Sequence, residues 1–467
     1  MKNWFRLIMF LTAILVVFVI VLFVGCAERS EIAELTAGTT STTSPGISVD
    51  PIVDETTTTS TTTTTSTTTT TLYSAQGVLD TSFSGDGIYT YSEYTKNFGA
   101  KGIIDQAGKI YVIGAIATDA SSATYDYAIW SFNDDGSANT AFSGDGFYSN
   151  DIADNADSGR AIVIDNDSKL VLTGFYYEVA NSNIFSSRLN SAGVLDTTFG
   201  EDGIALLSTA GLDAGDDLVV TSSGKILITG AYNGNLAVAK YNANAAGLDT
   251  SFGDEGVRVY PGLTGWGRKI AVDGVGNIYV VGQIRRAATH YDIAVLKFTP
   301  TGSLDTSFGD EGVFFYDNAA KADYGWGLAL DSDSRILYAG HVKPLTNDIN
   351  DTYVGRLNPN GTRDTSFNAP NGSHSLAIGD AILDEALGLA LDKQGRLVVV
   401  GTSNNKILVM RYRTDGTLDS SFADNGVFTY ALGASAKAND VFVDQSGRLV
   451  VTGLVGASEQ MFVMRLK

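Results

Sequence analysis

Three histidines are the side chains of this chain best suited to acid–base or metal chemistry. They are His290, His341 and His374, and they lie in segments that read as loops. A Ser-His-Asp triad needs an imidazole held by an acid and close to a hydroxyl, and no G-x-S-x-G elbow accompanies these residues. Paired histidines at helical spacing, typical of zinc sites, do not occur in the sequence. We therefore interpret all three as surface histidines and predict no catalytic residue and no metal site.

Two tryptophans form a candidate ligand platform. Each lies between glycines, in Gly265-Trp266-Gly267 and Gly325-Trp326-Gly327. Exposed aromatic rings in such segments can stack on a sugar or on a cation. The alternative interpretation is that Trp266 and Trp326 pack as large apolar rings between neighbouring structural units.

Short acidic turns that end in glycine offer carboxylates to a cation. Calcium prefers about six to eight oxygen ligands, and one such turn supplies too few. The turns also recur along the chain, which indicates a role in folding. We expect no cofactor, with calcium as the alternative. The turns span Ser84–Gly87, Glu201–Gly203, Asp254–Gly256 and Asp310–Gly312.

These turns belong to a phrase that occurs seven times, most cleanly as Leu304-Asp305-Thr306-Ser307-Phe308-Gly309. Its phenylalanine recurs at intervals of 53 to 59 residues. A fixed period of this size indicates one repeated supersecondary unit, in which each copy buries its apolar face against its neighbours. The repeat-defining phenylalanines are Phe83, Phe142, Phe199, Phe252, Phe308, Phe367 and Phe422.

Each unit is predicted to hold four strands separated by turns. In the last unit these are Val427–Leu432, Ala438–Val443, Arg448–Leu454 and Gln460–Leu466. An Asp-x-x-Gly-Lys/Arg turn precedes the third strand, where glycine supplies the positive φ that a hairpin requires. The strand after this turn is apolar without in–out alternation, which indicates that both of its faces are covered.

The last strand of each unit carries more charge than the others. Examples are Tyr291–Phe298 and Ile407–Tyr412. We interpret these as outer or edge strands, in which Lys297 and Arg411 discourage pairing with another chain.

Four antiparallel strands in a unit of about 56 residues, repeated radially, predict an all-β fold, a seven-bladed β-propeller over residues 73–467. An open solenoid is the alternative, and it would need atypical capping repeats at both ends. The terminal units look like the middle ones, which favours a closed ring that needs no extra segment.

The repeat resembles the delta-60 repeat family of bacterial surface and secreted proteins. The resemblance lies in Leu-Asp-x-x-Phe-Gly-x-x-Gly, the later Asp-x-x-Gly-Lys-Ile turn and an outgoing Ala-Val-x-Arg-Tyr-like strand, and it covers about 390 residues. It implies a propeller-like surface module and brings no catalytic residues. Two copies depart from the pattern, one at Ala138–Phe142 and one through Arg363 and the insertion Asn368–Asn371.

The N-terminus has the order of a secretion signal. Lys2 and Arg6 precede the apolar run Leu7–Val24, so residues 1–25 are predicted to be a signal peptide. The ending Phe23-Val24-Gly25-Cys26 resembles the lipobox of bacterial lipoproteins, which implies lipid attachment at Cys26, the only cysteine. An uncleaved signal anchor is the alternative, because 18 apolar residues are just long enough for a bilayer of about 30 Å. Both place the rest of the chain outside the cytoplasm, at the cell surface or in the periplasm.

Residues 26–72 are predicted to be a disordered Thr/Ser-rich linker. Thr56–Thr71 is threonine interrupted only by Ser60 and Ser66. Such a tract has no apolar periodicity with which to offset its ordering entropy. It would hold the remainder away from the membrane.

A formal net charge of -21 argues against nucleic acid or an anionic membrane surface as a partner, since both require a basic patch. The sequence therefore predicts a membrane-anchored, monomeric propeller that binds a cell-envelope protein or glycan without catalysis. The alternative is a carbohydrate-active enzyme, a glycoside hydrolase or lyase, with two carboxylates about 5–9 Å apart in a central pocket.

Overall fold

The computed structural model describes residues 76–467, apart from 95, 118–123, 154, 179–180, 287–289, 319–320, 345–348 and 379–382. All described strands fall in the second of the two units into which the chain divides, Tyr73–Lys467. The predicted signal segment, Cys26 and the Thr-rich linker lie outside the described residues. Within the described part, no helix is long and apolar enough to cross a membrane.

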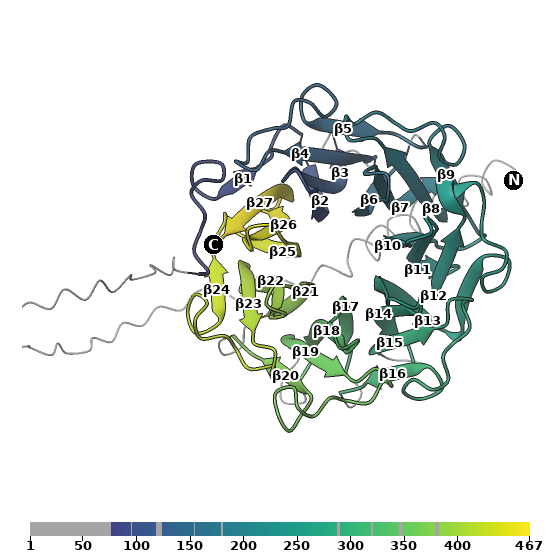
Figure 1. The fold of residues 1–467 in the computed structure, drawn as a ribbon. Helices are drawn as coiled ribbons and strands as arrows, with labels where there is room; N and C mark the ends of the chain where they lie inside the picture. Colours follow the sequence, from purple (N-terminus) through teal and green to yellow (C-terminus); the bar gives the residue numbers. More distant parts are fainter. Residues whose placement is uncertain are drawn as a thin grey trace, which may run out of the picture. The chain divides into compact units, whose positions relative to one another are not determined.

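The described residues form an all-β structure whose strands pair antiparallel, as the repeat predicts. Each sheet runs outward from an inner strand near the axis of a ring (Figure 1). The inner strands are β2 (Lys96–Ile104), β6 (Asp157–Ile164), β10 (Ala214–Val220), the second half of β13 (Val257–Val272), β17 (Tyr324–Leu330), β21 (Asp384–Leu391) and β25 (Ala436–Val443).

The second strands follow the Asp-x-x-Gly turns and are buried along most or all of their length. This burial confirms the prediction made from their continuous apolar runs, because a neighbouring sheet packs on each face of the strand, as it does on both faces of β7 (Leu170–Glu178). They are β3 (Ile110–Ala117), β7, β11 (Ile226–Tyr232), β14 (Ile278–Ile284), β18 (Ile336–Val342), β22 (Leu397–Ser403) and β26 (Leu449–Val455).

The charged strands predicted as edges are in fact third strands with partners on both sides. β23 (Lys406–Tyr412), for example, pairs with β22 and with β24 (Val427–Tyr430). The edge prediction was therefore wrong. The charged side chains bind the aspartate of the repeated phrase, Arg411 to Asp419 and Lys297 to Asp305, and do not protect an edge. The other third strands are β4 (Asp126–Phe132), β8 (Asn181–Leu189), β12 (Asn235–Tyr241), β15 (Asp292–Phe298), β19 (Asp351–Leu357) and β27 (Gln460–Leu466).

The edge strands are the short segments that follow the phrase. Each pairs with the third strand before it in the chain, so a sheet holds three strands of one sequence repeat and the first strand of the next. They are β5 (Phe147–Asn150), β9 (Ile204–Leu207), the first part of β13, β16 (Val313–Tyr316), β20 (Ser373–Leu376), β24 and β1 (Ile88–Thr90).

The ring closes because the last sheet also takes its edge strand from another repeat. β1, from the start of the described chain, pairs with β27 at its end, with Ile88 opposite Met464. The predicted closure is therefore made by a strand exchanged between the two ends, and the last sequence repeat does not supply all four strands of its own sheet. Since β1 completes the last sheet, the described array is a ring and not a stack with free ends (Figure 1).

One strand joins two sheets. The first part of β13 pairs with β12 and its second part pairs with β14, which produces a seven-stranded sheet beside five four-stranded ones in the described residues. A short 3-10 helix, Ala243–Ala245, follows β12.

The repeated phrase fastens each sheet to the next. All seven of its phenylalanines are fully buried. Gly309, directly after Phe308, donates its backbone N–H to the Asn360 carbonyl of the next repeat at 2.8 Å. Gly361 of that turn lies against the Phe308 ring, where a β-carbon would be 2.4 Å from the backbone nitrogen of Gly309. The same backbone contact recurs around the ring. The buried apolar residues gather between neighbouring sheets, as Val281 and Leu328 do.

Candidate functional site around the axis

Every inner strand carries a β-bulge at the same place. The pairing with the second strand skips one residue, for instance between Gly267 and Lys269 in β13 and between Gly325 and Gly327 in β17. Bulges change the direction of a side chain and are frequent at functional sites. The skipped residues differ from repeat to repeat, and they are Ala100, Arg160, Asp216, Arg268, Trp326, Leu387 and Asn439.

Arg268 connects the two predicted tryptophans. Its Cζ lies 5.4 Å from the centre of the Trp266 ring and 4.3 Å from that of Trp326. The structure thus brings Trp266 and Trp326 together, as a shared ligand platform requires, but a guanidinium lies over both rings. A cation–π arrangement of this kind orients the guanidinium.

Two polar partners fix the same guanidinium. Arg268 Nη1 lies 3.3 Å from Asp216 Oδ1 on β10. The Gln283 amide, oriented to satisfy both groups, accepts from Arg268 Nε and Nη2 at 3.2 and 3.0 Å. Arg268 is therefore a rigid part of the axial wall.

A layer of charge crosses the axis beside this cluster. Lys101 of β2 reaches Asp217 Oδ1 of β10 at 3.0 Å and the Asp216 carbonyl at 2.8 Å. Lys269 approaches the same Asp217 oxygen at 3.6 Å. Burial acts to raise the pKa of Asp217, but Lys101 and Lys269 outweigh it, so the pKa is lowered. This layer joins three inner strands, β2, β10 and β13.

His341 extends the aromatic cluster. It lies on β18 and is only 5% exposed, so its interpretation as a surface histidine was wrong. Its ring stacks 6.5 Å from Trp326, and its Nε2 lies 4.0 Å from Glu385 Oε1. Burial lowers the pKa of His341 below its usual value. The imidazole is therefore neutral near pH 7.

His374 also departs from the surface interpretation. It lies on β20, is partly buried against Tyr412 with ring centres 5.7 Å apart, and burial lowers its pKa. No described contact joins it to the axial residues.

Several polar atoms of the axial cluster have no hydrogen-bond partner among the described residues. They are buried, and buried polar groups in proteins are nearly always bonded to protein or to water. Water or a ligand can supply the partner that such atoms require. The atoms are Trp266 Nε1, Trp326 Nε1, His341 Nδ1 and Asp216 Oδ2.

The axial carboxylates are engaged with cations or amides. Asp216 pairs with Arg268, and Asp217 pairs with Lys101 and Lys269. Glu385 Oε1 accepts from Asn350 Nδ2 at 2.9 Å. A glycosidase needs one acid that can protonate a leaving group and one free carboxylate. The described axial residues offer no observation in favour of that chemistry.

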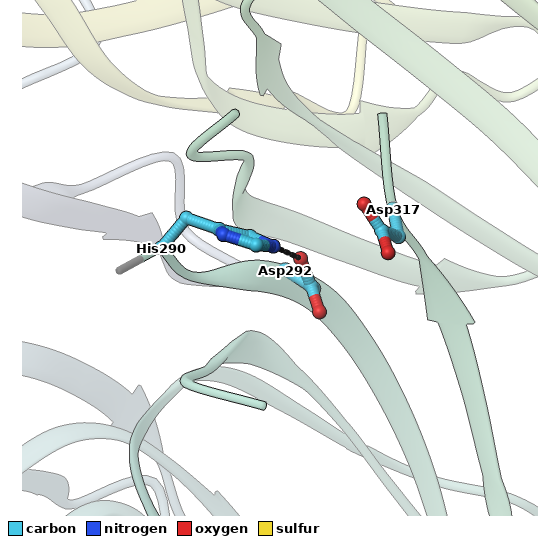
Figure 2. Close-up of side chains that lie close together, drawn as sticks. All are labelled: His290, Asp292 and Asp317. Carbon is cyan, nitrogen blue, oxygen red and sulfur yellow. Dashed lines mark ion pairs between the residues drawn. The ribbon is translucent and has the colours of Figure 1, made fainter. Parts of the chain in front are cut away.

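A second cluster lies away from the axis, on β15 and after β16. His290, Asp292 and Asp317 place one ligand atom each within 4.8 Å of one another (Figure 2). The sequence analysis missed this group. The only signal in the sequence was the His290-x-Asp292 spacing, since Asp317 is 25 residues further along.

Two family models match parts of the chain. A model described as a domain of unknown function (DUF5122) beta-propeller matches residues 276–308, 332–367 and 395–422, and a beta-propeller repeat model, SBBP, matches residues 260–284. The chain is a β-propeller. Both matched models describe propeller repeats, which agrees with the sheet arrangement of the described residues.

Solved structures also match this chain, at low sequence identity and with TM-scores below 0.5. An inactive virginiamycin B lyase from Staphylococcus aureus, with quinupristin, has 13% identity and a TM-score of 0.47, covering 81% of this chain and 99% of its own. A protein of unknown function from Dyadobacter fermentans has 9% identity and a TM-score of 0.43, covering 82% and 99%. The polysaccharide lyase Uly1 has 10% identity and a TM-score of 0.42, covering 84% and 96%. No curated protein matches the sequence.

Proposed function

We propose that this propeller is an exported, membrane-anchored binding module without catalysis, and that the axial cluster around Trp266, Arg268 and Trp326 recognises a glycan of the cell envelope. Its repeats are of the delta-60 kind, and its lipid anchor is attached at Cys26. The linker of residues 26–72 displays the propeller away from the membrane. Both Trp266 and Trp326 keep the role of ligand platform in this proposal.

The observation that carries the proposal is the convergence of unlike residues at equivalent bulge positions. In a repeat array, residues needed for folding recur in every copy, as the phrase phenylalanines do. Arg160, Asp216, Arg268 and Trp326 occupy one structural position and share no chemistry. Folding alone does not select such a set.

The chemistry of the cluster favours a ligand rich in oxygen acceptors. The indole N–H groups of Trp266 and Trp326 are donors without described partners. Sugars present many hydroxyl oxygens and also apolar ring faces, which suit indole edges and rings. Arg268 lies over both indoles, so the ligand contacts their N–H edges and does not insert between the rings.

The test is the affinity of the full chain for a panel of immobilised envelope glycans. Trp266→Phe and Trp326→Phe keep an aromatic ring for Arg268 but remove the indole N–H. Each should weaken binding about tenfold, which is the upper end of what one neutral hydrogen bond contributes. Val275→Ser, at a site 78% exposed on a turn, is the control and should bind as the wild type does. Failure to bind any envelope glycan would reject the proposal.

A further inference from the structure

Outside the axial cluster, one group of side chains has the composition of a metal site. Asp292 is the first residue of β15, and Asp317 follows the last residue of β16 directly. Ile293 pairs with Tyr316 across these strands, so Asp292 and Asp317 lie opposite each other at the next position along the ladder. His290 precedes β15 and directs its imidazole at the Asp292 carboxylate (Figure 2).

Asp292 is buried without the contacts that a buried carboxylate requires. It is 1% exposed, and neither of its carboxylate oxygens accepts a hydrogen bond. An ionised carboxylate in such surroundings is costly unless a cation or several donors balance it. Arg286 Nη1 lies 3.9 Å from Oδ2, too far for a hydrogen bond.

The distances fit a shared ion. His290 Nε2 and Asp292 Oδ1 are 3.4 Å apart and make no hydrogen bond. Two ligands at about 2.1 Å from a tetrahedral zinc ion are separated by about 3.4 Å. One ligand atom from each of the three residues lies within 4.8 Å of the other two. Asp317 is exposed, so a small rotation of its side chain completes the set.

The first sheet, β2–β5, contains a second copy of the acidic pair, but this copy has no histidine beside it. Tyr127 pairs with Asn150 there, which places Asp126 opposite Asp151 in the same way. Thr124 occupies the position of His290. Among the described residues, only the group at His290 combines an imidazole with two carboxylates in this arrangement.

We propose that His290, Asp292 and Asp317 bind one divalent ion of the zinc class, with water completing the coordination. A mixed set of one imidazole and two carboxylates suits zinc better than calcium, which prefers oxygen ligands alone. The ion would fasten the segment that enters β15 to the end of β16. The earlier prediction of no metal site would then be wrong at this position.

The experiment measures Zn²⁺ binding by equilibrium dialysis of the full chain, purified in detergent and treated with a chelator. The proposal predicts one tightly bound Zn²⁺ per chain. His290→Thr converts the group to the residues of the first sheet and should weaken binding at least tenfold. Asp317→Asn, at an exposed position, should have a similar effect without unfolding the protein. Asp126→Asn is the matched control and should leave Zn²⁺ binding unchanged.

Three results would overturn the proposal. The first is the absence of saturable Zn²⁺ binding. The second is equal Zn²⁺ affinity in the wild type and His290→Thr. The third is Ca²⁺ binding that is tighter than that of Zn²⁺ and unaffected by His290→Thr. A thermal melt of each metal-free variant shows whether it folds as the wild type does, and the test depends on that melt being unchanged.

Discussion

Arg465 Nε donates to Asp80 Oδ2 at 2.8 Å, which joins the last strand of the ring to the first copy of the phrase. Both side chains are 1% exposed. The guanidinium also lies over Phe83, with Cζ 5.0 Å from the ring centre. Burial opposes ionisation of Asp80, but hydrogen bonds from Ser82 and the charge of Arg465 outweigh it and lower the pKa of Asp80 to about 2.

Removing one partner of this pair should destabilise the ring. Arg465→Ser leaves a buried carboxylate with weaker partners, a change that typically lowers the free energy of unfolding by about 3–5 kcal/mol. In the second repeat, an asparagine and a serine take the places of this aspartate and arginine. There Asn139 Nδ2 donates to Ser131 Oγ at 3.0 Å, so a neutral hydrogen bond replaces the ion pair. Adding Asp80→Asn to Arg465→Ser should therefore recover part of the loss. Thermal unfolding of both variants tests this, and a double variant less stable than Arg465→Ser alone would contradict it.

The repeated phrase contacts a turn of the next repeat, as Gly309 does with Gly361. This contact predicts that two glycine substitutions have unequal effects on stability. Gly361 and Gly447 have similar positive φ values, 81° and 84°. A β-carbon at Gly361 would lie 2.4 Å from Gly309 N, whereas one at Gly447 would meet nothing within 4 Å. Gly447→Ala should cost about 1–2 kcal/mol from backbone strain. Gly361→Ala should cost clearly more, because it also separates two sheets, and equal unfolding midpoints would argue against the fastening role.

Stability should fall as pH rises through the acid range. Asp157 is fully buried, its Oδ2 accepts from Ile152 N, and burial, with added repulsion from Asp151 and Asp126, raises its pKa to about 7. The unfolded chain releases this proton near pH 3.8, so stabilisation present below that value is lost between about pH 4 and 7. The loss is at most on the order of 4 kcal/mol.

Asp157→Asn should flatten this dependence. Asn97 occupies the corresponding position of β2, so the amide fits the fold. Unfolding midpoints of wild type and variant at pH 5 and pH 8 provide the measurement. An identical pH dependence in the two proteins would show that Asp157 does not carry the effect.

Lipid attachment at Cys26 predicts that the chain carries a fatty acid and that this modification depends on the cysteine. Cys26→Ser cannot be acylated, so it should no longer incorporate labelled fatty acid. The unmodified chain should also migrate more slowly if the signal segment remains uncleaved. Unchanged incorporation of the label would reject lipid attachment at this cysteine, and membrane retention without any label in the wild type would favour the signal anchor.

Most features that recur could be predicted from the sequence, and most of those that occur once could not. Phe308 and the apolar run at Ile336–Val342 appear in every copy in some form, so their burial followed from the period alone. The edge assignment of Ile407–Tyr412 was wrong because a repeat boundary in sequence need not be a sheet boundary. The charge of Arg411 suggested an exposed side chain, but its guanidinium donates a buried hydrogen bond to Asp419.

The axial cluster was only half predictable. Trp266 and Trp326 stood out because glycines flank them, but their shared contact with Arg268 depends on bulge positions that one sequence does not reveal. The burial of His341 was missed for a similar reason, since a polar residue near the end of an apolar run reads as the start of a loop. Asp292 and Asp317 meet only because β15 and β16 pair in one register.

The most direct test of the axial binding site follows the emission of its own tryptophans. In a variant carrying Trp4→Phe and Trp130→Phe, Trp266 and Trp326 are the only tryptophans that remain. We predict that an envelope glycan that binds the protein changes this emission saturably, with the same midpoint as binding, and shields it from acrylamide. Saturable glycan binding with unchanged emission and unchanged quenching would contradict the account.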